Sequence, residues 1–217
     1  TIIPDAIGHL ISCSLITLPG VVYIAHLLVP DRSPVTSGDG AIDKGAENLM
    51  DAISTGTMNG LQLLLNIIAM IIVIVALVYL VNATLGMFPD VYGEAITLER
   101  ILGVLMAPLT MMMGIPWNEA FITGQLMGTK VVLTEFVAYV RFGQIPVEEL
   151  SERTRIIMTY ALCGFANFVS LGIMITGLVT MVPERKVEIM DMGLKSIIAG
   201  TITTCTSATL VGIIITL

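Results

Sequence analysis

The sequence predicts an all-α polytopic membrane protein, in which spanning helices accompany a re-entrant helical hairpin and a discontinuous helix. Three observations predict this class. First, the 217 residues are 55% hydrophobic and only 12% charged, whereas soluble domains carry about a quarter charged residues. Second, long uncharged runs alternate with short polar connections. Third, ionisable, Asn and Gly residues interrupt two apolar stretches where a plain spanning helix would hold Leu and Val.

The charge and the cysteines exclude several classes of protein. A formal charge of -7 offers no basic patch for nucleic acid. The cysteines Cys13, Cys163 and Cys205 lie in apolar stretches without a CxxC spacing, which favours small buried hydrophobes over a disulfide framework or a metal site. We expect no cofactor and no metal in this chain. Because the sequence starts without Met or a signal peptide, we expect it to be a piece of something longer.

Residues 1–29 form the first expected spanning helix, because 5–29 hold no Lys or Arg and a crossing needs about 20 residues. Pro19 predicts a kink. His9 and His26 lie on this segment, and interior or membrane-boundary histidines are favoured over a proton relay.

Residues 30–60 change in composition to a polar linker followed by a helical spacing of apolar residues. This pattern predicts an interfacial amphipathic helix along the membrane surface. Asp43, Glu47 and Asp51 recur at intervals of four. A solvated helix face is favoured over a metal-binding row of carboxylates.

Residues 61–88 predict a long, tilted spanning helix, because the core of this stretch carries no charge and exceeds one crossing. Residues 89–116 predict a broken apolar connection, since Pro108, Gly114 and Pro116 interrupt it.

Residues 117–142 are long enough for one crossing, yet Lys130 and Glu135 fall inside them. A re-entrant hairpin with its tip near Thr134 and Glu135 explains this better than a simple span. Such a tip presents backbone donors beside a carboxylate, which is typical of a polar-ligand site. The alternative is a Lys130–Glu135 ion pair that holds two helices together.

Residues 143–155 predict a polar connection, and 156–182 the next span. The middle of that span, GFANFVSLG, carries Asn167 and Ser170 between glycines, which predicts a discontinuous helix whose free backbone groups face a site. Close packing through small residues is the alternative, and both can hold together. Residues 183–195 predict a charged connection.

Residues 196–217 predict a final spanning helix rich in Thr, Ser and Ala. Its hydroxyls can hydrogen-bond back to their own helix, and we assign them no function.

The string GTKVVLTEFVAY at 128–139 resembles G-x-K-x-x-x-N-E-F-V-A-[aromatic or Met], which is characteristic of concentrative nucleoside transporters. IMTYALCGFANFVSLGIMITGL and the following VPERK resemble the penultimate membrane helix of that family and its exit. Two positions depart from the pattern: Thr134 stands where the motif has Asn, and Val169 replaces a residue that is commonly Ser.

The resemblance implies a cation-coupled nucleoside symporter, driven by sodium or protons, that forms a homotrimer in a membrane. The bacterial inner membrane is the expected location, and residues 61–88 would belong to the trimeric scaffold. The resemblance also implies that Glu135, Asn167 and Ser170 hold the ribose hydroxyls and that Phe165 packs near the ligand. Thr134 and Lys130 would support the hairpin tip.

The chain has no match to the family's other half, which carries the base-reading hairpin and the sodium site. The resemblance therefore implies a C-terminal half whose partner is the missing N-terminal half, and we expect no transport by the chain alone. The competing hypothesis is a non-transporting membrane assembly fragment with a structural Lys130–Glu135 ion pair. We expect no enzymatic activity, because no nucleophile–base–acid set appears.

Overall fold

The computed structural model describes residues 6–30, 47–91, 93 and 95–215. These residues form eight α-helices and two short 3-10 helices, at Val147–Glu149 and Pro183–Arg185. In chain order the α-helices are α1 (Ala6–Leu28), α2 (Leu49–Leu85), α3 (Leu98–Met112), α4 (Trp117–Val132), α5 (Glu135–Gln144), α6 (Glu152–Leu162), α7 (Phe168–Met181) and α8 (Lys186–Ile214).

Within the part of the chain that the structure describes, three helical segments are long and apolar enough to cross a membrane. They are Ile7–Leu28 of α1, all of α2 (Leu49–Leu85), and Pro183–Ile214, which joins the second 3-10 helix to α8. The all-α membrane class predicted from the sequence is confirmed.

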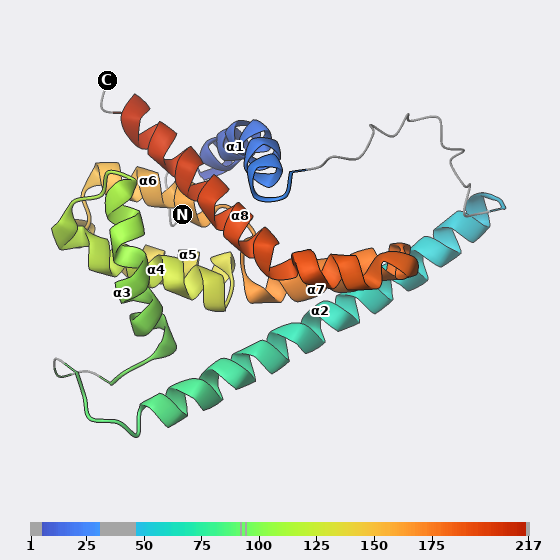
Figure 1. Ribbon diagram of the computed structural model, residues 1–217, viewed down its shortest axis with the longest axis horizontal. Coiled ribbons are helices and arrows are strands. Elements are labelled where there is room, and N and C mark those ends of the chain that lie inside the picture. The colour runs from blue at the N-terminus through green and yellow to red at the C-terminus, as the bar shows by residue number, and fades with distance from the viewer. Residues whose placement is uncertain (1–5, 31–46, 92, 94, 216–217) are drawn as a thin grey trace.

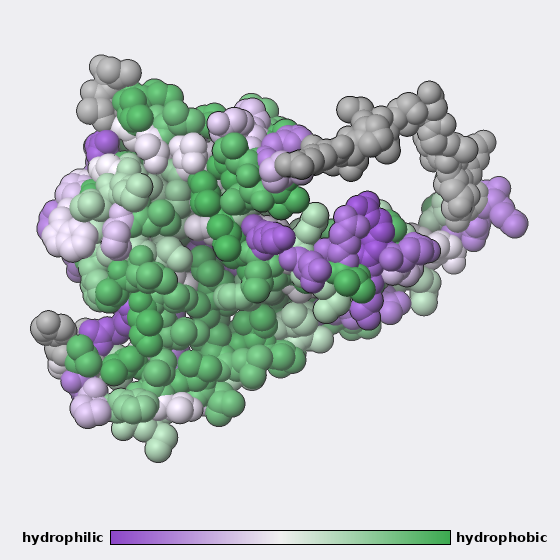
Figure 2. Space-filling view, viewed as in Figure 1, coloured by the Kyte–Doolittle hydropathy of each residue, from purple (hydrophilic) through white to green (hydrophobic). Residues whose placement is uncertain are grey.

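The core lies where α1, α4, α5, α6 and α8 meet, on one side of the molecule (Figure 1). Its most deeply buried side chains include Met127, Phe142, Ile157, Met158 and Leu162. Helix α2 lies outside this body, contacts mainly α7 and α3, and has no buried residue. Much of the surface in this view is hydrophobic, whereas hydrophilic residues gather near the end of α7 and the start of α8 (Figure 2).

Helices α4 and α5 form the predicted hairpin. Thr129 and Arg141, one on each arm, meet through a 3.0 Å hydrogen bond from Arg141 Nη1 to Thr129 Oγ1, so the arms run antiparallel. The turn is short: α4 ends at Val132, and Thr134 caps α5 by accepting a hydrogen bond from the Val137 amide. Glu135 is therefore the first residue of the second arm.

Three glycines allow α3 and α4 to pack with their backbones in contact. A Cβ atom on Gly124 would lie 2.4 Å from the Gly103 carbonyl oxygen, and one on Gly128 would lie 3.1 Å from the Glu99 carbonyl oxygen. Because no side chain separates the two helices there, α3 provides a firm base for the first arm of the hairpin.

The predicted discontinuous helix is present as α6 and α7, separated by residues 163–167. Asn167 starts the second half, since its Oδ1 accepts a 2.7 Å hydrogen bond from the Ser170 amide. An Asn at this position is a strong helix N-cap, which explains why the chain resumes its helix there.

Two of the predicted boundaries were wrong near α2 and α3. A single helix runs through Leu49–Leu85, so residues 49–60 are not a separate interfacial helix, and 31–46, including Asp43, lie outside the described residues. The helix starts at 49 because Asn48 caps it by accepting from the Asp51 amide. Residues 89–116 contain α3 (Leu98–Met112), which continues through Pro108.

Two other boundaries were placed too late. The first half of the broken helix starts at Glu152 rather than 156, because Ser151 accepts from the Thr154 amide and caps it. Residues 183–195 are mostly helical, since α8 starts at Lys186. Charged residues at a membrane boundary do not end a helix whose backbone has no proline or turn signal.

Candidate functional site

The hairpin tip meets the helix break through one hydrogen bond between side chains. Asn167 Nδ2 donates to Glu135 Oε2 over 2.8 Å. Glu135 opens α5, and Asn167 precedes the first residue of α7. The N-termini of two short helices therefore converge on a carboxylate, and the partial positive charge at each N-terminus stabilises it.

Asn167 is held at both ends of its amide. Its Nδ2 donates to Glu135, its Oδ1 accepts from the Ser170 amide, and the side chain is 1% exposed. Ser170 uses its backbone in this contact, and its hydroxyl forms no hydrogen bond with any described residue. The Ser170 hydroxyl thus remains available to a ligand.

Glu135 faces a cavity of about 610 Å³ between the hairpin tip, the helix break and α2. Ile71 and Val75 of α2 form part of its apolar wall, and Phe165 and Ser170 come from the break and α7. Its volume falls in the range of small-molecule sites. Glu135 Oε1 has no hydrogen-bond partner among the described residues, so this carboxylate can accept from a bound hydroxyl group.

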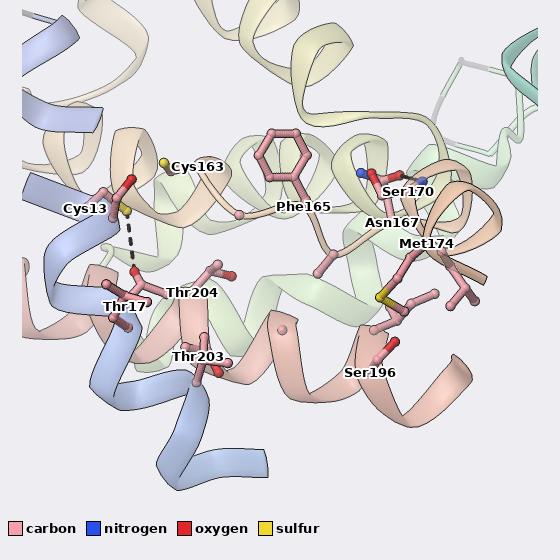
Figure 3. Close-up of a pocket in the computed structure, with 18 residues that line it drawn as sticks. Cys13, Thr17, Cys163, Phe165, Asn167, Ser170, Met174, Ser196, Thr203 and Thr204 are labelled. Carbon is pink, nitrogen blue, oxygen red and sulfur yellow. Dashed lines mark hydrogen bonds between the residues drawn. The ribbon is translucent and has the colours of Figure 1, made fainter. Parts of the chain in front are cut away.

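A second cavity, of about 390 Å³, lies between α1, the break, α7 and α8 (Figure 3). Phe165, Ser170 and Met174 line both cavities. Phe165 is 74% exposed and projects from the break on the side away from α8. An exposed aromatic ring beside a carboxylate, a hydroxyl and an amide can pack against a ring-shaped ligand while the polar groups bind its hydroxyls.

Lys130 lies in the last turn of α4, and its ion pair with Glu135 is not formed. The Lys130 side chain is fully buried, and Nζ donates to the Ala161 carbonyl oxygen over 2.7 Å and to Thr204 Oγ1 over 3.1 Å. The ion pair was therefore wrong, whereas support of the hairpin tip by Lys130 stays a prediction. The sequence showed a nearby acid, whereas the acceptor is a backbone carbonyl 31 positions along the chain.

A polar chain that the sequence analysis missed connects α2 to the hairpin. Glu99 is 7% exposed; Oε2 accepts from Asn82 Nδ2 over 3.0 Å and Oε1 lies 3.4 Å from Arg141 Nη2. Asn82 Oδ1 also accepts from the Leu98 amide. The only sequence signal was an Asn inside an apolar span, which usually marks a hydrogen bond to a neighbouring helix.

The first helix contributes to the site more than the sequence indicated. Ser14 and Thr17 line the second cavity, and Thr17 Oγ1 lies 3.0 Å from Ser207 Oγ of α8. His9 contacts the Tyr160 hydroxyl through Nδ1 over 3.2 Å, so it is a paired interior histidine.

Comparison with known proteins identifies the class of molecule. Residues 9–212 match the family model described as "Na+ dependent nucleoside transporter C-terminus". The chain is 38% identical over 214 residues to an uncharacterized transporter of Bacillus subtilis, covering 96% of the chain and 53% of that relative. It is 39% identical over 213 residues to a nucleoside permease of Helicobacter pylori, covering 95% and 51%.

A solved structure shows the same fold. A variant of CNTnw in an intermediate state aligns with a TM-score of 0.84 at 34% identity, covering 96% of this chain and 52% of that one. The chain therefore belongs to the sodium-dependent, concentrative nucleoside transporter family and matches its C-terminal part, which confirms the resemblance. It spans about half the length of the bacterial relatives it matches.

Proposed function

We propose that this chain supplies the ribose-binding half of a cation-coupled nucleoside symporter. The observation that carries the proposal is the Glu135–Asn167 contact, because it sets a carboxylate with one free oxygen at the meeting point of two helix N-termini. A carboxylate in apolar surroundings is costly unless it serves a ligand or a partner. A vicinal diol provides two hydroxyl donors, which match the remaining capacity of that carboxylate.

Each site residue has a separate role in this proposal. Glu135 accepts from the ribose hydroxyls through Oε1, and the Ser170 hydroxyl provides a second polar contact. Asn167 orients the carboxylate with one amide hydrogen and can offer its other hydrogen to the sugar. Phe165 packs against the nucleoside from the exposed side of the break, and Thr134 supports the tip by capping α5.

The proposal requires partners outside this chain. Because its relatives are about twice as long, we propose that an N-terminal half reads the base and binds the coupling cation, sodium or proton. The apolar face of α2, with no buried residue, is the surface we assign to a homotrimer in the bilayer. The Bacillus and Helicobacter relatives fit a bacterial cell membrane, which is the inner membrane in a species with two, and we expect no uptake by this chain alone.

Calorimetric titration of the complete transporter, meaning this chain together with its N-terminal half, tests the ribose role. We expect uridine to bind more tightly than 2′-deoxyuridine, and uracil most weakly. The E135Q variant should weaken uridine binding by about tenfold or more, because a hydrogen bond to a charged group contributes about 1.5–3 kcal/mol.

The control is E148Q, which changes an exposed glutamate in the 3-10 helix Val147–Glu149 and should leave uridine affinity unchanged. Equal uridine affinity of E135Q and the wild type would overturn the ribose role.

A further inference from the structure

Lys130 poses an energetic problem that the nucleoside site does not explain. Its ammonium group is 0% exposed, and none of the described carboxylates lies within ion-pair distance of it. A buried, unpaired charge is strongly unfavourable unless fixed dipoles compensate it. The compensation must therefore come from the two oxygens that accept its hydrogen bonds.

The first acceptor belongs to the C-terminal end of α6. Ala161 lies in the last turn of that helix, where carbonyl oxygens have no partner within the helix and carry the negative end of its dipole. The second acceptor, Thr204 Oγ1 of α8, donates its own hydrogen to the Thr201 carbonyl and so presents a lone pair to the ammonium. A cation is the group that this arrangement favours.

The hairpin reaches the same helix end from its second arm. The Tyr139 hydroxyl donates to the Thr159 carbonyl oxygen over 2.6 Å. Both arms thus cap α6, one with an ammonium and one with a neutral hydroxyl. Gly164 leaves room for this arrangement, because a Cβ atom there would lie 2.1 Å from Thr204 Cγ2.

Two contacts then connect the same two segments. Lys130 lies five residues before Glu135, and Ala161 lies six residues before Asn167. The Lys130–Ala161 contact holds the end of α6, and the Glu135–Asn167 contact holds the start of α7. The two contacts therefore lie on opposite sides of the break, one at its start and one at its end.

We propose that Lys130 is a tethered cation that occupies the C-terminal end of α6 and holds the helix break in the shape that sets Asn167 against Glu135. It is a positioning residue, which acts on the ligand through Asn167. Its effect on uridine rests on the proposed function, whereas its effect on the helix break does not.

The sharpest test removes the Lys130 side chain and leaves an empty space in its place. We expect K130A in the complete transporter to lower the melting temperature and to weaken uridine binding about tenfold or more. Methylammonium chloride should restore both, because the small cation can enter the vacated space and meet the same carbonyl. Tetramethylammonium chloride at equal ionic strength has no N–H donor and should restore neither.

Two further variants separate charge from packing. K130M fills the space without a charge, so it should bind uridine as weakly as K130A and show no rescue by methylammonium. K195A removes an exposed lysine of α8 and should behave like the wild type. If K130M binds uridine as the wild type does, or if methylammonium fails to restore K130A, the tethered-cation proposal is wrong.

The pair T204V and T204S keeps the test decisive if the Lys130 variants do not fold. T204S retains the acceptor and should match the wild type, whereas T204V lacks it and should weaken uridine binding several-fold. Equal binding by both would overturn the proposal. The rescue of the melting temperature is measured without nucleoside. If methylammonium rescues K130A in that measurement while E135Q binds uridine like the wild type, only the ribose role of Glu135 is rejected.

Discussion

Asn167 combines two tasks that are usually given to different residues. Its oxygen caps α7 and its nitrogen holds Glu135, so the start of the helix and the direction of the carboxylate depend on one amide. An Asn is the residue that does both, because it carries an acceptor and a donor on the same short side chain. Substitutions can therefore separate the two tasks.

The N167D variant should still fold but should bind uridine more weakly. An Asp can still accept from the Ser170 amide, but it cannot donate to Glu135 and places a second negative charge beside it. We expect the uridine dissociation constant of the complete transporter to rise about tenfold or more, and the melting temperature to fall by several degrees because the new charge is buried beside Glu135. Titration calorimetry and thermal unfolding measure these quantities.

The matched control is N118D, which makes the same change at an exposed position in the first turn of α4. An acid is favourable there, so binding should not change. Wild-type affinity in N167D would show that the Asn167 donor has no part in binding uridine.

The helical elements show which signals in a sequence determine local structure. The hairpin and the broken helix could be predicted because Lys130, Glu135, Asn167 and Ser170 interrupt apolar runs, and lipid tolerates such groups only inside a structure that satisfies them. The acceptor of Lys130 could not be predicted, because a backbone carbonyl leaves no mark in the sequence and Glu135 was the visible partner.

The start of α2 was misjudged for a related reason. Residues 49–60 are more polar than the rest of the helix, but the backbone hydrogen bonding continues without a break. The sequence reports the environment of a helix more directly than its ends, which depend on caps such as Asn48. The glycine contact between α3 and α4 was likewise invisible until the two helices were placed together.

That contact predicts a strong effect of one methyl group. In G124A the added carbon would press on the Gly103 carbonyl and lie 2.9 Å from the Ala107 amide nitrogen, and backbone atoms cannot move aside as a flexible side chain can. Overpacking of this kind destabilises by about 1–3 kcal/mol or more. We expect a clear fall in melting temperature and in the yield of folded protein on size-exclusion chromatography.

The comparison variant is G60A on α2, where an added Cβ meets nothing within 4 Å. It should be neutral or slightly stabilising, since Ala is a better helix former than Gly. Similar melting temperatures for G124A and G60A would show that α3 and α4 can separate without loss of stability.

At the scale of the whole molecule, α2 is the helix whose length and exposed apolar surface the rest of the chain explains least. At 1.5 Å per residue its 37 residues extend over about 55 Å, compared with a hydrocarbon layer of about 30 Å. One face contacts α7, as where Met70 covers Gly172, and the opposite face bears Leu65, Ala69, Ile72 and Ala76, all exposed. Small residues on that face permit close approach of another helix.

Cross-linking in membranes tests whether this face meets a second copy. With A76C, a short bifunctional thiol-reactive linker should give a band at twice the protomer mass on denaturing gels, and a trifunctional linker a band at three times that mass. M70C, which faces α7, should give only the single protomer. Absence of cross-linked species with A76C, when the thiol is shown to be reactive, would remove the trimer surface from α2.

The convergence of the α5 and α7 N-termini on Glu135 has an electrical consequence. If Glu135 holds the ribose as proposed, fixed backbone dipoles offset the carboxylate, and a neutral sugar would arrive or leave without a mobile counter-ion accompanying it. Around the ribose, the loaded and unloaded carriers would then have the same charge, and membrane voltage would act on both alike. Any difference in their response to voltage would have to originate where the driving ion is held.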